Sequence, residues 1–155
     1  MNAITAQLDL LIRARGGLIH VVARDEAALE PCWPQLTLPL FSWDIARGWR
    51  DTEADRGSVV AALQRVRQHR GAGLFLLRDV HPYLMRPLEH SAVIRELKNL
   101  AAELPRDRQT LILITPQPCL PIDLWEQCPV LEVPSPSPRR SGTRFSSLSP
   151  PGRRN

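Results

Sequence analysis

Lysine is almost absent from this sequence. The single lysine, Lys98, lies inside a long stretch with apolar residues at helical spacing, so no loop carries a lysine to neutralise a bound phosphate. No apolar run is long enough to span a bilayer. The first residues carry an acid, Asp9, in their apolar part and lack a cleavage site of small residues, so we expect no signal peptide. These absences predict a cytoplasmic protein.

Cysteines are few and badly placed for pairing. Cys32, Cys119 and Cys128 are odd in number and widely spaced, with no CxxC pair. This pattern argues against a structural disulfide or a zinc site and predicts free thiols in a reducing cytoplasm. No G-x-S-x-G turn is present, and no metal-ligand spacing connects the four histidines, which are His20, His69, His81 and His90.

Acidic residues are missing from one end of the chain only. The whole chain has a net charge of +4, but residues 134–155 hold five arginines and no acid. The remaining residues 1–133 therefore have 15 basic and 16 acidic side chains, a net charge of −1. The basicity belongs to the tail, and the folded part offers no electrostatic footprint for nucleic acid.

The first 133 residues alternate between strand-like and helix-like patterns. Helices are expected near residues 4–12, from Asp25 to Trp33, after a Ser58 cap, from Leu88 to Leu104 and near residues 123–127. Apolar segments predict five strands: Leu18–Ala23, Leu38–Trp43, Leu74–Leu77, Thr110–Thr115 and Val130–Val133. We therefore predict a three-layer α/β sandwich with a mainly parallel five-stranded sheet.

The composition changes abruptly at Pro134. Residues 135–155 are rich in serine, proline and arginine, and such a segment cannot bury enough apolar surface to offset the entropy of ordering. We predict one domain, residues 1–134, followed by a disordered tail.

The stretch "LFLLRD" resembles half of a nucleotide site. In P-loop hydrolases one apolar strand ends in an acid that holds magnesium, as Asp79 would here, and another strand leads into a glycine-rich loop with a lysine. After the first predicted strand, however, the sequence is "RDEAALEPCW", with no glycine and no lysine. Arg24, Asp25 and Glu26 would put two carboxylates where a phosphate would sit.

Other roles for Asp79 stay open at this point. Val80 follows it in place of the glutamate that AAA+ hydrolases use to polarise water. Asp79 is expected to hydrogen-bond backbone amides or cap the next turn. Asp79 and His81, two residues apart, form an alternative cation site, although metal sites usually need a third or fourth ligand.

Several segments together are similar to a known family. "FSWDIARGW", "LLRDVHPYL" and "IRELKNLA" are the most specific of them, and the similarity covers nearly all of residues 1–136. They resemble the N-terminal half of the conserved-reading-frame AAA+ ATPases of cyanobacteria, chloroplasts and related bacteria. In that group the N-terminal domain is a degenerate AAA+-like α/β domain without a phosphate loop, and a competent AAA+ module follows it.

The resemblance assigns two site residues. It implies that Asp79 stands at the degenerate Walker B position and Thr115 at the sensor-1 position, as cofactor-binding positions without the loop that would engage them. ATP and magnesium are then cofactors only at the level of the family, and we expect none here. The expected partners are an AAA+ module or other subunits of the family, and a homo-oligomer is one possible assembly. We expect binding to neither a membrane nor nucleic acid. Where relatives continue into the ATPase module, residues 135–155 differ, and a truncated or frameshifted gene product is our hypothesis for them.

The expected function is a non-catalytic accessory or regulatory domain that acts through protein contacts. The alternatives are a weak ATP-binding protein that uses Asp79 and Thr115, and non-specific nucleic-acid binding through the arginine-rich tail. Trp49 and Arg95 are further candidates for partner contacts. Trp49 either is exposed as a contact or packs on its own loop, and Arg95 is either an arginine finger or a solvated or salt-bridged side chain.

Overall fold

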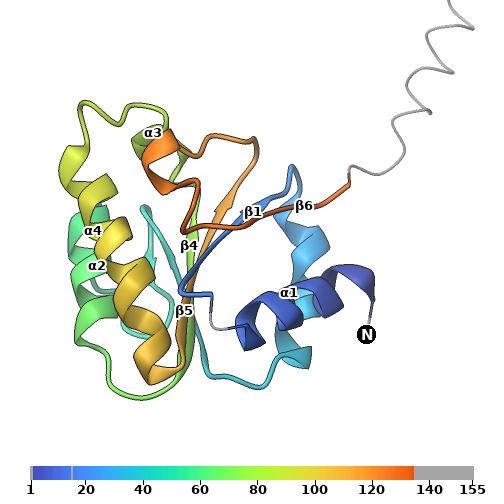
Figure 1. Ribbon diagram of the computed structural model, residues 1–155. Helices are drawn as coiled ribbons and strands as arrows, with labels where there is room; N and C mark the ends of the chain where they lie inside the picture. Colours follow the sequence, from blue (N-terminus) through green and yellow to red (C-terminus); the bar gives the residue numbers. More distant parts are fainter. Residues whose placement is uncertain (1, 15, 135–155) are drawn as a thin grey trace, which may run out of the picture.

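The computed structural model describes residues 2–14 and 16–134, which form a mixed sheet covered by helices on both faces (Figure 1). The predicted tail, residues 135–155, lies outside the described residues. Its disorder and its origin therefore stay predictions. The sheet has six strands in the order β3-β2-β4-β5-β1-β6. Their bounds are β1 Leu18–Val22, β2 Leu40–Asp44, β3 Gly48–Trp49, β4 Gly73–Arg78, β5 Gln109–Thr115 and β6 Val130–Glu132.

The predicted three-layer α/β architecture is confirmed, but the predicted strand number is wrong. Five strands run parallel to one another, and the sixth, β3, pairs antiparallel with β2. Only two residues long, β3 is too short to produce an apolar pattern in the sequence. Gly48, with φ +75°, makes the tight return from β2 possible, because L-residues rarely adopt that conformation.

Three of the helices begin at capping residues that the sequence provides. Asn2, Asp25 and Ser58 each accept a backbone N–H at the start of a helix. The stretch after Asp25 is a 3₁₀ helix, because Pro31 and Pro34 lack the N–H groups that a regular α-helix needs. The bounds are α1 Ala3–Arg13, η1 Glu26–Gln35, α2 Val59–Gln68, α3 His81–Leu84, α4 Ser91–Glu103, η2 Leu104–Asp107 and η3 Ile122–Leu124.

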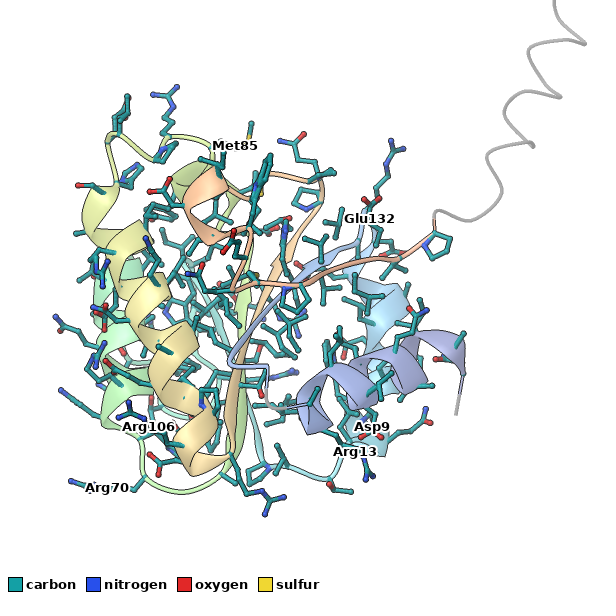
Figure 2. The ribbon with its side chains drawn as sticks, viewed as in Figure 1. Asp9, Arg13, Arg70, Met85, Arg106 and Glu132 are labelled. Atoms are coloured by element: carbon teal, nitrogen blue, oxygen red, sulfur yellow. The ribbon has the colours of Figure 1, made fainter. Side chains whose placement is uncertain are left out.

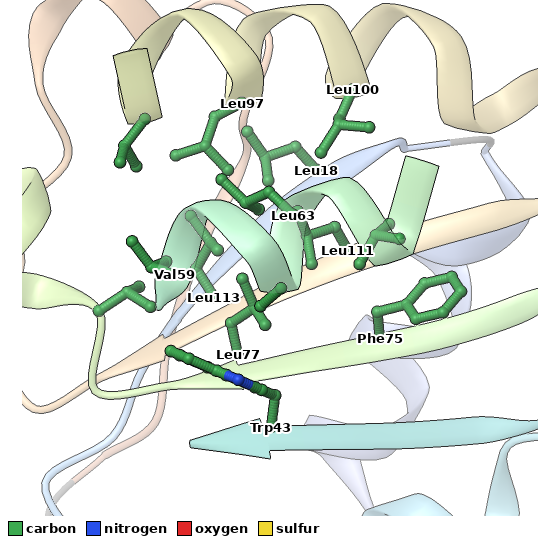
Figure 3. Packing of buried hydrophobic residues seen from close by; sticks show 14 of the residues in the cluster. Leu18, Trp43, Val59, Leu63, Phe75, Leu77, Leu97, Leu100, Leu111 and Leu113 are labelled. Atoms are coloured by element: carbon green, nitrogen blue, oxygen red, sulfur yellow. The ribbon is translucent and has the colours of Figure 1, made fainter. Parts of the chain in front are cut away.

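Two apolar cores hold the layers together, one on each face of the sheet. Alternate residues of β5 face opposite sides: Leu111 and Leu113 pack under α2 and α4, whereas Ile112 packs under α1 and η1. Figure 3 shows the larger core, in which Leu63 of α2 and Leu97 of α4 meet the sheet. Strands buried on both faces explain the continuous apolar segments in the sequence.

Within residues 2–14 and 16–134, none of the helices combines the length and the apolar character needed to cross a bilayer.

Candidate functional site

The carboxyl edge of the parallel strands brings the two predicted site residues together. Arg78 of β4 pairs with Ile114 of β5, and the amide of Asp79 donates to the Ile114 carbonyl at 2.8 Å. Asp79 and Thr115, which directly follow this pair, are therefore neighbours at the edge where α/β sheets usually bind ligands. Their assignment to the degenerate Walker B and sensor-1 positions stays a prediction.

Asp79 itself is exposed and has a left-handed backbone, with φ 58°. The expectation that its carboxylate caps the next turn is wrong, because Val80 is the N-cap of α3 and no side chain caps that helix. Among the described residues, no group of three or more His, Cys, Asp or Glu side chains is placed to hold a metal ion. A non-glycine residue in this backbone region is strained, and such strain often occurs at functional sites.

Thr115 is fully buried, and its hydroxyl is already used. It donates to the Gln117 carbonyl at 2.8 Å and lies 2.7 Å from Nε2 of His20, a residue of β1. The thiol of Cys119 donates to the same oxygen at 3.7 Å. Since a hydroxyl has one hydrogen to donate, His20 must donate from Nε2, which leaves its Nδ1 unprotonated and without a partner.

The groups around Thr115 are uncharged at neutral pH. Burial lowers the pKa of His20 to about 4, so its imidazole is neutral. Burial also raises the pKa of the Cys119 thiol, and it raises the pKa of the Cys128 thiol to about 12. This cluster therefore contains neither a thiolate nor an imidazolium at neutral pH. Since a thiol must ionise to act as a nucleophile, its cysteines are unreactive. His20 itself is fully buried in the core.

The turn after β1, where a phosphate loop would lie, is closed by the protein's own side chains. The carboxylate of Asp25 accepts the Ala27 amide at 3.0 Å and so caps η1. Glu26 binds Arg78 at 3.1 Å, and Arg78 also donates to the Ser42 hydroxyl at 2.9 Å. The side chain of Arg78 is only 12% exposed. Carboxylates therefore hold the amide and the guanidinium that an anionic ligand would need.

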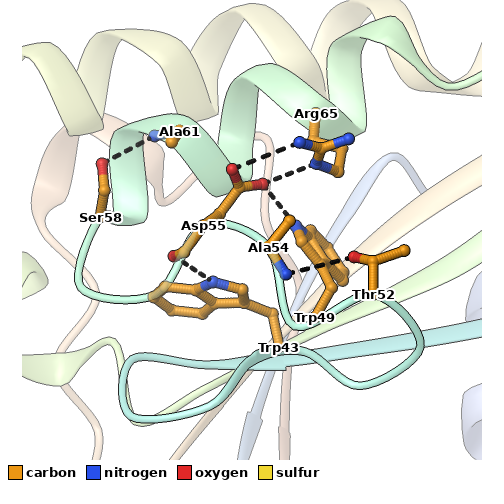
Figure 4. Close-up of polar contacts among 8 residues, drawn as sticks. All are labelled: Trp43, Trp49, Thr52, Ala54, Asp55, Ser58, Ala61 and Arg65. Carbon is orange, nitrogen blue, oxygen red and sulfur yellow. Dashed lines mark hydrogen bonds and ion pairs between the residues drawn. The ribbon is translucent and has the colours of Figure 1, made fainter.

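The hairpin of β2 and β3 is fixed by a polar network (Figure 4). Asp55 accepts the indole N–H of Trp49 at 2.9 Å and the Nε of Arg65 at 2.7 Å, while its backbone carbonyl accepts the Trp43 indole at 3.0 Å. The hydrogen bond from Arg65 is the main reason why the pKa of Asp55 is lowered. Trp49 is only 3% exposed, so it packs on its own loop and the interpretation of an exposed partner contact is wrong.

We expect Asp55→Ala to lower the free energy of unfolding by about 1 to 2 kcal/mol, because the buried Trp49 indole loses its acceptor. The measurement is urea denaturation followed by tryptophan fluorescence. Glu53→Ala is the control, since it removes only an exposed ion pair with Arg56 and should change stability by less than about 0.5 kcal/mol. Equal effects of the two substitutions would contradict the role given to Asp55.

Arg95 and Trp125 are both exposed, and the solvated alternative for Arg95 is confirmed. Arg95 is exposed on α4, and its guanidinium donates to Asn99 at 2.8 Å, whereas Glu96 binds Arg67. Trp125, which follows η3, is exposed. Two acids lie close to it in the sequence "DLWEQ", and such neighbours are typical of an exposed residue.

Comparisons with known proteins agree with this architecture. Two curated relatives are uncharacterized AAA domain-containing proteins named ycf46, from Pyropia yezoensis and Guillardia theta. The first is 26% identical over 144 residues, 86% of this chain, and the second 25% over 138 residues, 82% of this chain. The chain spans only 28% and 26% of the lengths of these relatives.

A solved structure shows the same fold. A chain in the E. coli MS115-1 HORMA:CdnC:Trip13 complex matches with a TM-score of 0.51 at 18% identity, over 94% of this chain and 57% of that chain. The model of the family "SpoVK-like AAA ATPase, N-terminal domain" matches residues 4–133. This match spans every strand of the sheet together with the closed turn after β1, and it shows that the chain belongs to the family of SpoVK-like AAA ATPase N-terminal domains.

Proposed function

We propose that this chain is a non-catalytic accessory domain that regulates or docks onto an AAA ATPase module through protein contacts. Family membership supports the link to an AAA ATPase. The regulatory role rests on a separate observation at the carboxyl edge of the sheet, where the groups that would bind a nucleotide are engaged with one another.

The closed turn after β1 carries the proposal. A phosphate at the start of η1 would have to displace Asp25 from the Ala27 amide and would face the negative charge of Glu26. At the neighbouring strand end, the hydroxyl of Thr115 has no hydrogen left to offer a ligand. Opening this site would break at least two hydrogen bonds between charged groups and their partners, each contributing about 1.5 to 3 kcal/mol.

The proposal also places the chain in the cytoplasm. All three cysteines are free thiols, and two of them are buried, which suits a compartment that keeps thiols reduced.

The test is calorimetric titration of ATP and magnesium into the full chain. We expect no saturable heat at micromolar nucleotide, because Asp25 and Glu26 hold the Ala27 amide and Arg78, and their two carboxylates oppose the single exposed Arg24 at this turn. Saturable binding that is weakened at least about tenfold by Asp79→Asn would instead establish a weak ATP site at Asp79 and Thr115 and refute the proposal. Asp107→Asn, an exposed acid on η2 at the opposite edge of the sheet, is the matched control.

A further inference from the structure

Trp125 displays its side chain at the surface. It is 63% exposed, whereas the other three tryptophans, Trp33, Trp43 and Trp49, are buried. Its indole N–H donates to the Leu120 carbonyl at 2.8 Å, which holds the ring in place. Ile122 is exposed on the same short segment, and Val130 is exposed on β6. A fixed and exposed aromatic ring loses little conformational entropy when a partner covers it, which makes it an efficient contact.

A hollow of about 410 Å³ lies beside this ring. Its lining is mainly apolar and includes Cys119, Leu120, Trp125, Cys128 and Val130, with Glu132 at its margin. We name it the β6 hollow. The lining provides apolar contact for a hydrophobic side chain, and the exposed indole forms one wall.

The strand that forms another wall of the β6 hollow has an open edge. β6 is the last strand in the sheet order, and among the described residues it pairs only with β1. The Pro129 carbonyl and the Val133 amide bond β1, so by alternation the backbone groups of Val130 and Glu132 face away from the sheet. Both residues are exposed. An open edge is a template on which an extended peptide adds as a further strand.

Acidic residues lie in the lining of the β6 hollow and beside Trp125 in the sequence. Asp123 and Glu126 flank Trp125 in the sequence, and Glu132 projects from β6; all three are exposed. None of them forms an ion pair with another described residue. Uncompensated acids around an apolar hollow favour a partner with the opposite charge.

We propose that the open edge of β6 binds an extended, basic segment of a partner protein, with one apolar side chain of that segment seated in the β6 hollow against Trp125. This deepens the proposed function and rests on it, since it gives the protein contact a surface and the partner a chemistry. Backbone hydrogen bonds to Val130 and Glu132 would supply affinity, and the acids and the hollow would supply selectivity.

The experiment measures binding of a fluorescein-labelled synthetic peptide, alternating arginine and serine around a central phenylalanine, to the full chain by fluorescence anisotropy. The same peptide with glutamate in place of arginine is the control ligand. We expect saturable binding of the arginine peptide only, and binding should weaken as salt is raised because exposed charges are screened.

Two variants of the surface have matched controls elsewhere. Trp125→Ala and Glu132→Lys should each weaken binding more than about tenfold. Leu10→Ala changes a residue that is 69% exposed on α1, and Asp107→Lys reverses an acid on η2, next to Arg106 and far from Glu132 (Figure 2). Both controls should bind within about twofold of the wild type. Urea denaturation of each variant verifies that it is folded.

Four outcomes would overturn the inference. These are failure of the arginine peptide to bind, equal binding by all variants, self-association that Trp125→Ala abolishes, and binding that emerges only when Arg139 and Arg140 are replaced by glutamate. Self-association would identify a second copy of the chain as the occupant of the β6 edge. Binding that depends on the replacement of Arg139 and Arg140 would identify the chain's own basic segment as the occupant. If neither the arginine peptide nor ATP binds, this inference alone is refuted. If ATP binds at Asp79, the proposed function is refuted.

Discussion

Replacing Gly48 with alanine is expected to lower the free energy of unfolding by at least about 3 kcal/mol. A Cβ at this position would lie 2.2 Å from the Ala54 carbonyl oxygen and 2.9 Å from that of Glu53, both of them backbone atoms. The same Ala54 oxygen accepts the amide of Trp49, so it cannot withdraw without breaking the β2–β3 hairpin. The left-handed φ of +75° adds strain for any residue with a Cβ.

Gly57 provides a matched control in the same loop. Its φ is +76°, but a Cβ there would meet nothing within 4 Å. Gly57→Ala should therefore cost only the backbone strain, about 1 to 2 kcal/mol. Urea denaturation of the two variants, followed by tryptophan fluorescence, separates the clash from the strain. Equal losses in the two variants would show that backbone strain alone explains Gly48.

Lowering the pH from about 7.5 to about 5 is expected to remove about 2 kcal/mol of stability through His20 alone. Its pKa is about 4 in the folded chain, below the ordinary value of 6.5, because burial disfavours the charged imidazole. The unfolded chain therefore binds a proton more readily than the folded chain. The stabilising contribution is fully present above about pH 6.5, falls as the pH drops, and is lost by about pH 4.

His20→Leu tests this titration, because it removes the titrating group from a buried site on β1, between β5 and β6. The variant should have a smaller loss of stability than the wild type between about pH 7.5 and pH 5, whatever its stability at neutral pH. Parallel pH profiles from urea denaturation would contradict a buried neutral His20.

Local patterns in the sequence predicted most of the elements correctly. "TLILIT" predicts a buried strand because an uncharged and mainly apolar segment is typical of a strand covered on both faces. β5 is that strand, extended by Gln109. Ser58 predicts a helix start because its side chain can accept an orphan amide, and it accepts that of Ala61 at 3.1 Å. Such signals act over a few residues and need no knowledge of the fold.

The candidate site could be predicted only in part for the same reason. Asp79 and Thr115 lie at strand ends, and parallel pairing places them at one edge. By contrast, the contact between His20 and Thr115 joins residues 95 positions apart, and nothing near either residue in the sequence indicates it. The burial of Trp49 depends in the same way on a loop that folds back over β3 and brings Asp55 to its indole.

By itself, the sequence determined the alternation of elements, the caps, and the absence of glycine and lysine after the first strand, because each depends on residues close together in the chain. Only the tertiary structure decided that Asp25 and Glu26 close the turn after β1, that His20 stays neutral, and that Trp125 stands exposed beside an open strand edge. Those properties depend on which distant groups meet and how far water is excluded from them, and the packing of the sheet with its two helical layers sets both.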